Sequence, residues 1–107
     1  IKHPTKEHMR LRYGVLEGPE HGVYIRGKLI NSNIIELPEH WTGLVDEDTI
    51  TVQLTPTGKF QKLYVKEIND NKITIGNSSF FSNKTECFYF VQGTRKDVDE
   101  LEIEYEN

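Results

Sequence analysis

The sequence is poor in the residues that build covalent and metal-based sites. It has one cysteine, Cys87, among 107 residues, which excludes an intrachain disulfide and a zinc site of several cysteines. Cys87 lies in an apolar, strand-like run, which favours a buried thiol over a nucleophile. The four histidines, His3, His8, His21 and His40, show no metal-ligand spacing, so we expect no metal and no cofactor. Copies of one histidine meeting on a three-fold axis remain the alternative.

Long apolar runs and a surplus of positive charge are also lacking. No stretch approaches the roughly 20 apolar residues that cross a bilayer, and no signal-peptide pattern opens the chain. Lysine and arginine number 13 against 17 aspartates and glutamates, a net charge of −4, which disfavours contact with phosphate-rich surfaces. We therefore expect no nucleic acid partner and no membrane insertion. Because the chain begins at Ile1, we expect a piece of a longer protein.

The length and polarity of the chain favour one small domain. A chain of 107 residues, 36% of them hydrophobic, is long enough for one core and too short for two. A small core on a polar chain also favours completion by partner subunits. We expect a single β domain over residues 1–97, followed by an acidic C-terminal strand or tail over residues 98–107.

Alternation of apolar and polar residues is the main pattern in the chain. In "VYIRGKL", Val23, Ile25 and Leu29 fall on one face, and "TITVQLT" repeats the alternation. The turn signals "NSN", "PTGK" and "NDN" separate such runs, and we expect "NSN" at 31–33 to close a hairpin onto "IIEL". We predict an all-β fold of about eight short antiparallel strands in a sandwich or barrel-like arrangement.

One segment interrupts the strands. In "LPEHWTGLVDEDT", Pro38 ends the preceding run, and Trp41, Leu44 and Val45 fall at helical spacing. We expect a short helical turn near Trp41 that covers one end of the core, with the indole filling the core. A tryptophan that stacks on a sugar ring is the alternative.

The run "CFYFV" is apolar on both faces. Phe88 and Phe90 point opposite to Cys87, Tyr89 and Val91, and a strand of this kind must be covered on both sides. A subunit interface that includes Phe88 and Phe90 is one explanation. The other is a loop, "SSFF", that folds over the strand.

Exposed aromatic residues beside cations offer a binding surface. Tyr24 and Tyr64 fall on the outward phase of their strands, near Arg26 and Lys62. An aromatic ring with a polar tip suits carbohydrate, so we predict these four residues as candidates for glycan or receptor binding. A solvated sheet face is the alternative.

Carboxylates and a histidine surround Gly18 and Pro19 in "EGPEH". Glu17 and Glu20 could flank a scissile bond as in a glycosidase, with His21 as a base, but nothing else in the sequence supplies a cleft. We interpret Glu17 and Glu20 as the polar edge of a bend at a subunit boundary. There we expect Arg12 or Arg26 of a neighbouring chain to pair with a carboxylate.

The motif order resembles a known family. His3-Pro4, "EGPEH", "VYIRG", "IELPEHWTGLVDEDTITVQLTPTG", "LYV" and "GTRKD" together resemble a β-rich domain of tailed-phage virion structural and tail-fibre-like proteins, as found in phages of marine bacteria. The resemblance extends from His3 to Asp97. It implies a module of a long fibrous protein in the extracellular phage particle, and it transfers no catalytic residue.

From the residues and the resemblance together we expect a non-enzymatic structural or oligomerisation module of a virion fibre or appendage, homotrimeric. The alternative is a carbohydrate- or receptor-binding tip domain of the same kind of fibre, which takes part in host attachment. A small hydrolase or self-cleaving domain that uses Glu17, Glu20 and His21 is the third interpretation.

Overall fold

The computed structural model describes residue 6 and residues 19–79 and 84–97. The all-β prediction is confirmed, although these ranges hold six strands rather than about eight. The elements follow in the order β1 (Gly22–Ile30), β2 (Ile34–Glu36), α1 (Trp41–Leu44), η1 (Glu47–Thr49), β3 (Thr51–Pro56), β4 (Leu63–Asn69), β5 (Lys72–Asn77) and β6 (Glu86–Thr94).

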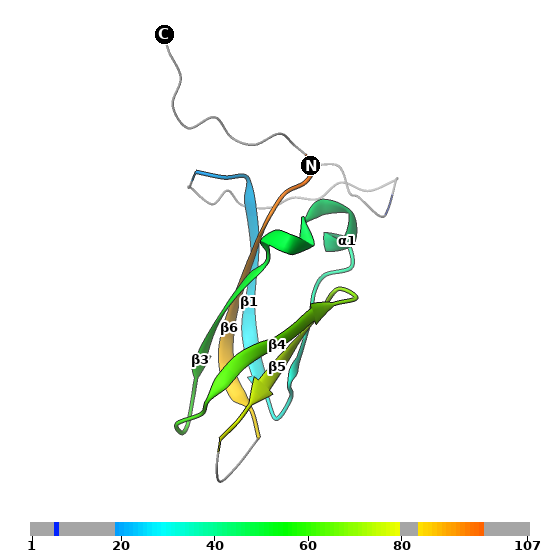
Figure 1. Cartoon of the computed structure of the whole chain (residues 1–107). Coiled ribbons are helices and arrows are strands. Elements are labelled where there is room, and N and C mark those ends of the chain that lie inside the picture. Colours follow the sequence, from blue (N-terminus) through cyan, green and yellow to red (C-terminus); the bar gives the residue numbers. More distant parts are fainter. Residues whose placement is uncertain (1–5, 7–18, 80–83, 98–107) are drawn as a thin grey trace.

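The strands form two antiparallel sheets of three strands each, β1–β6–β3 and β2–β5–β4. Figure 1 shows β4 and β5 lying across the layer formed by β1, β6 and β3. The central strand β6 pairs Thr94 with Gly22 at one end and Glu86 with Ile30 at the other. The chain therefore enters the first sheet and leaves it at the same end.

The core lies between the two sheets. Val23 and Val91 reach it from the first sheet, and Ile73 and Ile75 reach it from the second; each is at most 6% exposed. Cys87 is fully buried, and this burial raises the pKa of its thiol. The prediction of a buried cysteine is thus confirmed.

The helical turn near Trp41 is also as predicted. α1 covers one end of the core, with Trp41 1% exposed and Leu44 fully buried. A buried indole is not available to stack on a sugar, so the core-filling interpretation of Trp41 is confirmed. In the described residues no helix is both long and apolar enough to cross a membrane.

The hairpin that we expected across residues 31–33 is wrong. β1 pairs with β6 and β2 pairs with β5, so the chain crosses from one sheet to the other here. Asn31 takes a positive φ of 53° and donates its backbone N–H to Thr85 O, at 2.7 Å. Alternation fixes which face of a strand is apolar but does not select the strand beside it. Because β2 pairs with β5, Ile35 enters the core from the second sheet.

Candidate functional site

The outward side of the first sheet carries most of its exposed aromatic and cationic residues. Because side chains alternate along a strand, the residues between the core positions of β1, β6 and β3 all face away from the core. The register places Arg26 beside Phe90 and Lys28 beside Phe88. We call this surface the aromatic face; it consists of Tyr24, Arg26, Lys28, Gln53, Thr55, Phe88 and Phe90.

The rings of the aromatic face contact one another and a cation. Tyr24 and Phe90 stack with their centroids 5.2 Å apart and their planes 11° from parallel, an arrangement that stabilises aromatic pairs. Lys28 Nζ lies 5.3 Å from the centre of the Phe88 ring and 3.5 Å from Glu86 Oε1. Both lysine contacts are solvent-exposed and therefore weak, so Lys28 remains available to a partner.

The aromatic face is open. Phe88 is 52% exposed and Tyr24 is 44% exposed, and a shallow groove of about 550 Å³ runs past Phe88 between Arg26 and Lys28 on one side and Gln53 and Thr55 on the other. Grouped exposed apolar residues rimmed by polar groups are typical of interaction sites. The face is thus the first candidate site.

The four residues predicted to bind a glycan or receptor do not share one surface. Tyr24 and Arg26 lie on the aromatic face, whereas Tyr64 belongs to β4 in the second sheet. There its ring covers Gly76, where a Cβ would collide with it. Lys62 precedes β4 and accepts a hydrogen bond from Ser78 N at its carbonyl oxygen, at 3.0 Å.

The residues predicted at a subunit interface are also divided. Phe88 and Phe90 lie on the aromatic face, whereas Glu20 lies in the bend before β1. Arg12 and Glu17 lie outside the described residues. The interface interpretation therefore rests on the two phenylalanines.

Glu20 and His21 lie in the bend before β1 and are hydrogen-bonded to residues at the end of β6. Glu20 Oε2 accepts a hydrogen bond from Thr94 Oγ1, at 3.1 Å. The backbone oxygen of His21 accepts one from Arg95 N, at 2.8 Å. Both residues are exposed, and these two hydrogen bonds connect the start of β1 to the end of β6.

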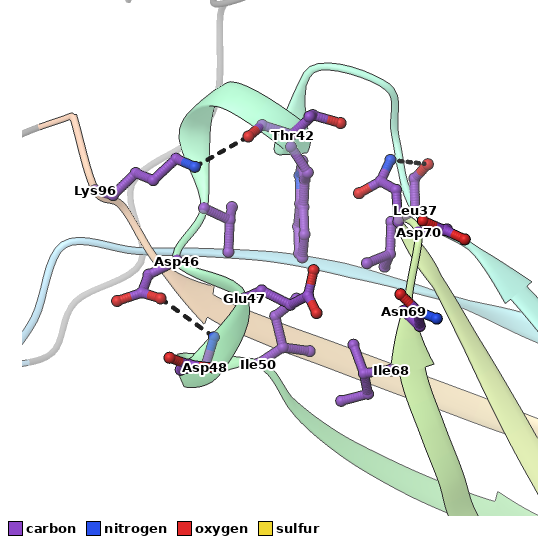
Figure 2. A pocket seen from close by; sticks show the side chains of 13 residues that line it. Leu37, Thr42, Asp46, Glu47, Asp48, Ile50, Ile68, Asn69, Asp70 and Lys96 are labelled. Carbon is purple, nitrogen blue, oxygen red and sulfur yellow. Dashed lines mark hydrogen bonds between the residues drawn. The ribbon is translucent and has the colours of Figure 1, made fainter.

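A second candidate site is a cleft of about 580 Å³ between the helical segment and the β4–β5 turn (Figure 2). Its apolar lining includes Trp41, Val45, Ile50 and Ile68, which belong to the core or pack against it. The polar residues come from several segments of the chain. They are Thr42, Asp46, Glu47, Asp48, Asn69, Asp70, Asn71 and Lys96.

The cleft is bordered by carboxylates. Figure 2 shows Asp46 and Asp48 on one side and Asp70 on the other. The ammonium of Lys96 donates to Thr42 O, at 3.0 Å. In the part of the chain that the structure describes, the ion pairs are Lys28–Glu86 and Arg95–Asp97, so the carboxylates of the cleft have no ion-pair partner there. These described residues also contain no cluster of three or more side chains placed to hold a metal ion.

No sequence motif marks this cleft as a site. Its lining residues were assigned separately, to a helical turn, a strand end and the "NDN" turn, and they share no motif. The density of carboxylates in "LVDEDT", residues 44–49, was the available signal. Only the packing of the β4–β5 turn opposite this segment brings Asp70 toward it.

An exposed ion pair fastens the chain after β6. Arg95 Nε and Nη2 donate to Asp97 Oδ1 and Oδ2, at 2.9 and 2.8 Å. These bonds and the guanidinium charge lower the pKa of Asp97, while the same bonds raise the pKa of Arg95. The backbone of Arg95 also forms an isolated antiparallel β-bridge with Val45, which lines the cleft. The Arg95–Asp97 ion pair therefore lies next to the wall of the cleft.

No protein-family model matches the chain, and neither a curated protein nor a solved structure matches it. The resemblance to virion proteins therefore stays a prediction from the sequence motifs. The aromatic face and the acidic cleft are the structural basis for a functional assignment.

Proposed function

We propose that this chain is a non-enzymatic structural module of a phage virion fibre or appendage protein, where it associates with copies of itself as a homotrimer in the extracellular particle. The aromatic face supplies the contact. The motif order from His3 to Asp97 supports the virion setting.

The observation that carries the proposal is the uncovered outer side of β6. Phe88 is 52% exposed on a three-stranded sheet, while Cys87 and Val91 of the same strand are fully buried on its other side. Apolar residues grouped on an open strand face are costly in water and mark contact surfaces, and a strand that is apolar on both sides is typically covered on both. Lys28 lies over part of the Phe88 ring, which still leaves about half of the side chain exposed, and Phe80 and Phe81 of the "SSFF" loop lie outside the described residues. A neighbouring chain is the proposed cover.

Replacing Phe88 tests this proposal. Phe88→Ser removes the exposed ring without disturbing the core, so the folded chain is retained. We expect its association constant to fall at least about tenfold, the loss typical of an interface residue that matters. The measurement is solution mass by light scattering across a concentration series.

Phe60→Ser is the matched control for Phe88→Ser. Phe60 is the same residue type, is 82% exposed, and lies in the β3–β4 connection, outside the residues that make up the aromatic face. Its replacement should leave the association constant unchanged. Equal losses in the two variants would show non-specific hydrophobic association and would contradict the proposal.

Carbohydrate or receptor binding by a tip domain is the second candidate function. The observation that favours it is the groove of the aromatic face, where Arg26, Gln53 and Thr55 place polar groups beside exposed rings. Aromatic faces rimmed by hydrogen-bonding groups suit sugar rings. This candidate predicts that Tyr24→Ala abolishes binding to immobilised oligosaccharides while the fold and the oligomeric state persist. Unchanged binding would remove it.

A further inference from the structure

The aromatic face and the cleft carry opposite charge. The face presents Arg26 and Lys28. Lys28 shares its charge with Glu86 in an exposed pair, whereas the guanidinium of Arg26 has no ion-pair partner within the described ranges. The cleft presents Asp46, Glu47, Asp48 and Asp70 against Lys96. Charge complementarity of this kind steers partners together and fixes their orientation.

The two surfaces also match in their apolar parts. Below the carboxylates the cleft is lined by Ile50 and Ile68, which are only partly buried and pack on the core. The face offers Phe88 as a projecting ring between its cations and the polar side chains of β3. A ring that enters the cleft would cover apolar surface on both chains while Arg26 and Lys28 meet the carboxylates.

Face-to-face pairing of two identical aromatic faces is disfavoured by the same charges. A two-fold contact sets each surface against its own copy, so Arg26 and Lys28 would lie against the cations of the partner. Like charges brought together in a partly desolvated contact are costly. A contact between two different surfaces avoids this cost, and repeated around an axis it closes a ring, as a trimer requires.

We infer that the aromatic face of one copy docks over the acidic cleft of the next, with Arg26 and Lys28 against the carboxylates of Asp46, Glu47, Asp48 and Asp70. This inference rests on the proposed self-association, and it names the two surfaces that meet. The contact is heterologous, so every copy uses its face once and its cleft once.

Charge reversal tests the contact. The double variant Arg26→Glu/Lys28→Glu and the double variant Glu47→Lys/Asp48→Lys alter exposed side chains only. Each should weaken association about a hundredfold, because each sets like charges together at every contact. Combining all four substitutions in one chain restores opposite charges, so association should return to within about tenfold of the original chain.

The control is Glu36→Lys/Glu67→Lys, which reverses two exposed carboxylates on the second sheet. It makes the same change in net charge as the cleft variant and should leave association unchanged. Far-ultraviolet circular dichroism and thermal unfolding confirm that each variant is folded. Raising the salt concentration should weaken the original trimer, since screening reduces attraction between exposed charges.

The possible outcomes distinguish the face-to-cleft contact from the more general proposal that the chain self-associates through its aromatic face. Recovery in the fourfold variant supports the face-to-cleft contact. If Phe88→Ser weakens association but the charge reversals do not, or if the fourfold variant fails to recover, the inference is overturned and self-association through the aromatic face stands. If the original chain is monomeric at all concentrations, both fall.

Discussion

At the scale of single residues, the buried side-chain amide of Gln61 stabilises the β3–β4 connection, which links the two sheets. Gln61 is 4% exposed, and its Nε2 donates to Glu86 O at 2.8 Å and to Thr57 O at 3.0 Å. Its Oε1 accepts from Glu86 N at 2.9 Å. Together with the backbone bond from Thr57 N to Glu86 O, these bonds hold the β3–β4 connection beside the start of β6.

Gln61→Leu should therefore destabilise the fold strongly. The substitution keeps a similar volume but removes the side-chain bonds to Glu86 N and Thr57 O, while Glu86 O keeps the bond that it accepts from Thr57 N. We expect this loss to lower the free energy of unfolding by about 3 kcal/mol. Urea denaturation measures it. Gln92→Leu is the control: Gln92 is half-buried on the outward side of β6, and its replacement should change the stability by less than about 0.5 kcal/mol. Equal losses would refute the clamp role of Gln61.

The Arg95–Asp97 pair gives a pH-dependent contribution to stability. Because bonding to Arg95 lowers the pKa of Asp97 in the folded chain, the contribution is present above the ordinary pKa of aspartate and disappears as the pH falls through the lowered value. Asp97→Asn should cost about 0.5 kcal/mol at pH 7, a small effect because the pair is partly exposed. At strongly acidic pH the variant and the original chain should unfold alike. A difference that persists there would contradict the ion-pair explanation.

At the scale of elements, the β4–β5 turn shows one residue with two roles. Asp70 and Asn71 have positive φ angles of 51° and 59°, as a two-residue type I′ hairpin turn requires. Asn71 Nδ2 also donates to Leu37 O at 3.1 Å and to Pro38 O at 2.9 Å. The turn thereby anchors the segment that leads into α1 and closes one side of the cleft.

Glycine substitutions separate these two roles. Glycine suits a positive φ at either position, so Asp70→Gly should change the stability by less than about 0.5 kcal/mol. Asn71→Gly keeps the backbone conformation but loses both side-chain bonds, and we expect it to lower the free energy of unfolding by about 1.5 kcal/mol. Thermal and urea unfolding check both variants. A neutral Asn71→Gly would show that the two bonds do not contribute.

The strands were predictable and their partners were not. Alternation in residues 23–29 and 49–55 correctly gave the buried and exposed sides of β1 and β3, because a half-buried strand must alternate. The pairing of β3 with β6, 30 or more residues later in the chain, has no local signal. The turn at Asp70 and Asn71 does close a hairpin, whereas residues 31–33 carry similar turn residues and cross between sheets.

At the scale of the whole molecule, the two candidate surfaces also differ in how far the sequence predicts them. The aromatic face was predictable in part, because Tyr24 and Arg26 on β1 and Phe88 and Phe90 on β6 each showed their outward phase. Their assembly into one surface required the β1–β6 register. The cleft forms only where three separate segments of the chain meet. Its carboxylates therefore do not all lie together in the sequence and form no recognisable motif.

The measurement that tests self-association most directly is the solution mass of the original chain by light scattering, from dilute to concentrated samples. We predict a concentration-dependent rise from the mass of one chain to three times that mass, with no larger species accumulating. A mass equal to one chain at every concentration would contradict self-association through the aromatic face. It would leave glycan or receptor binding at that face as the function to test.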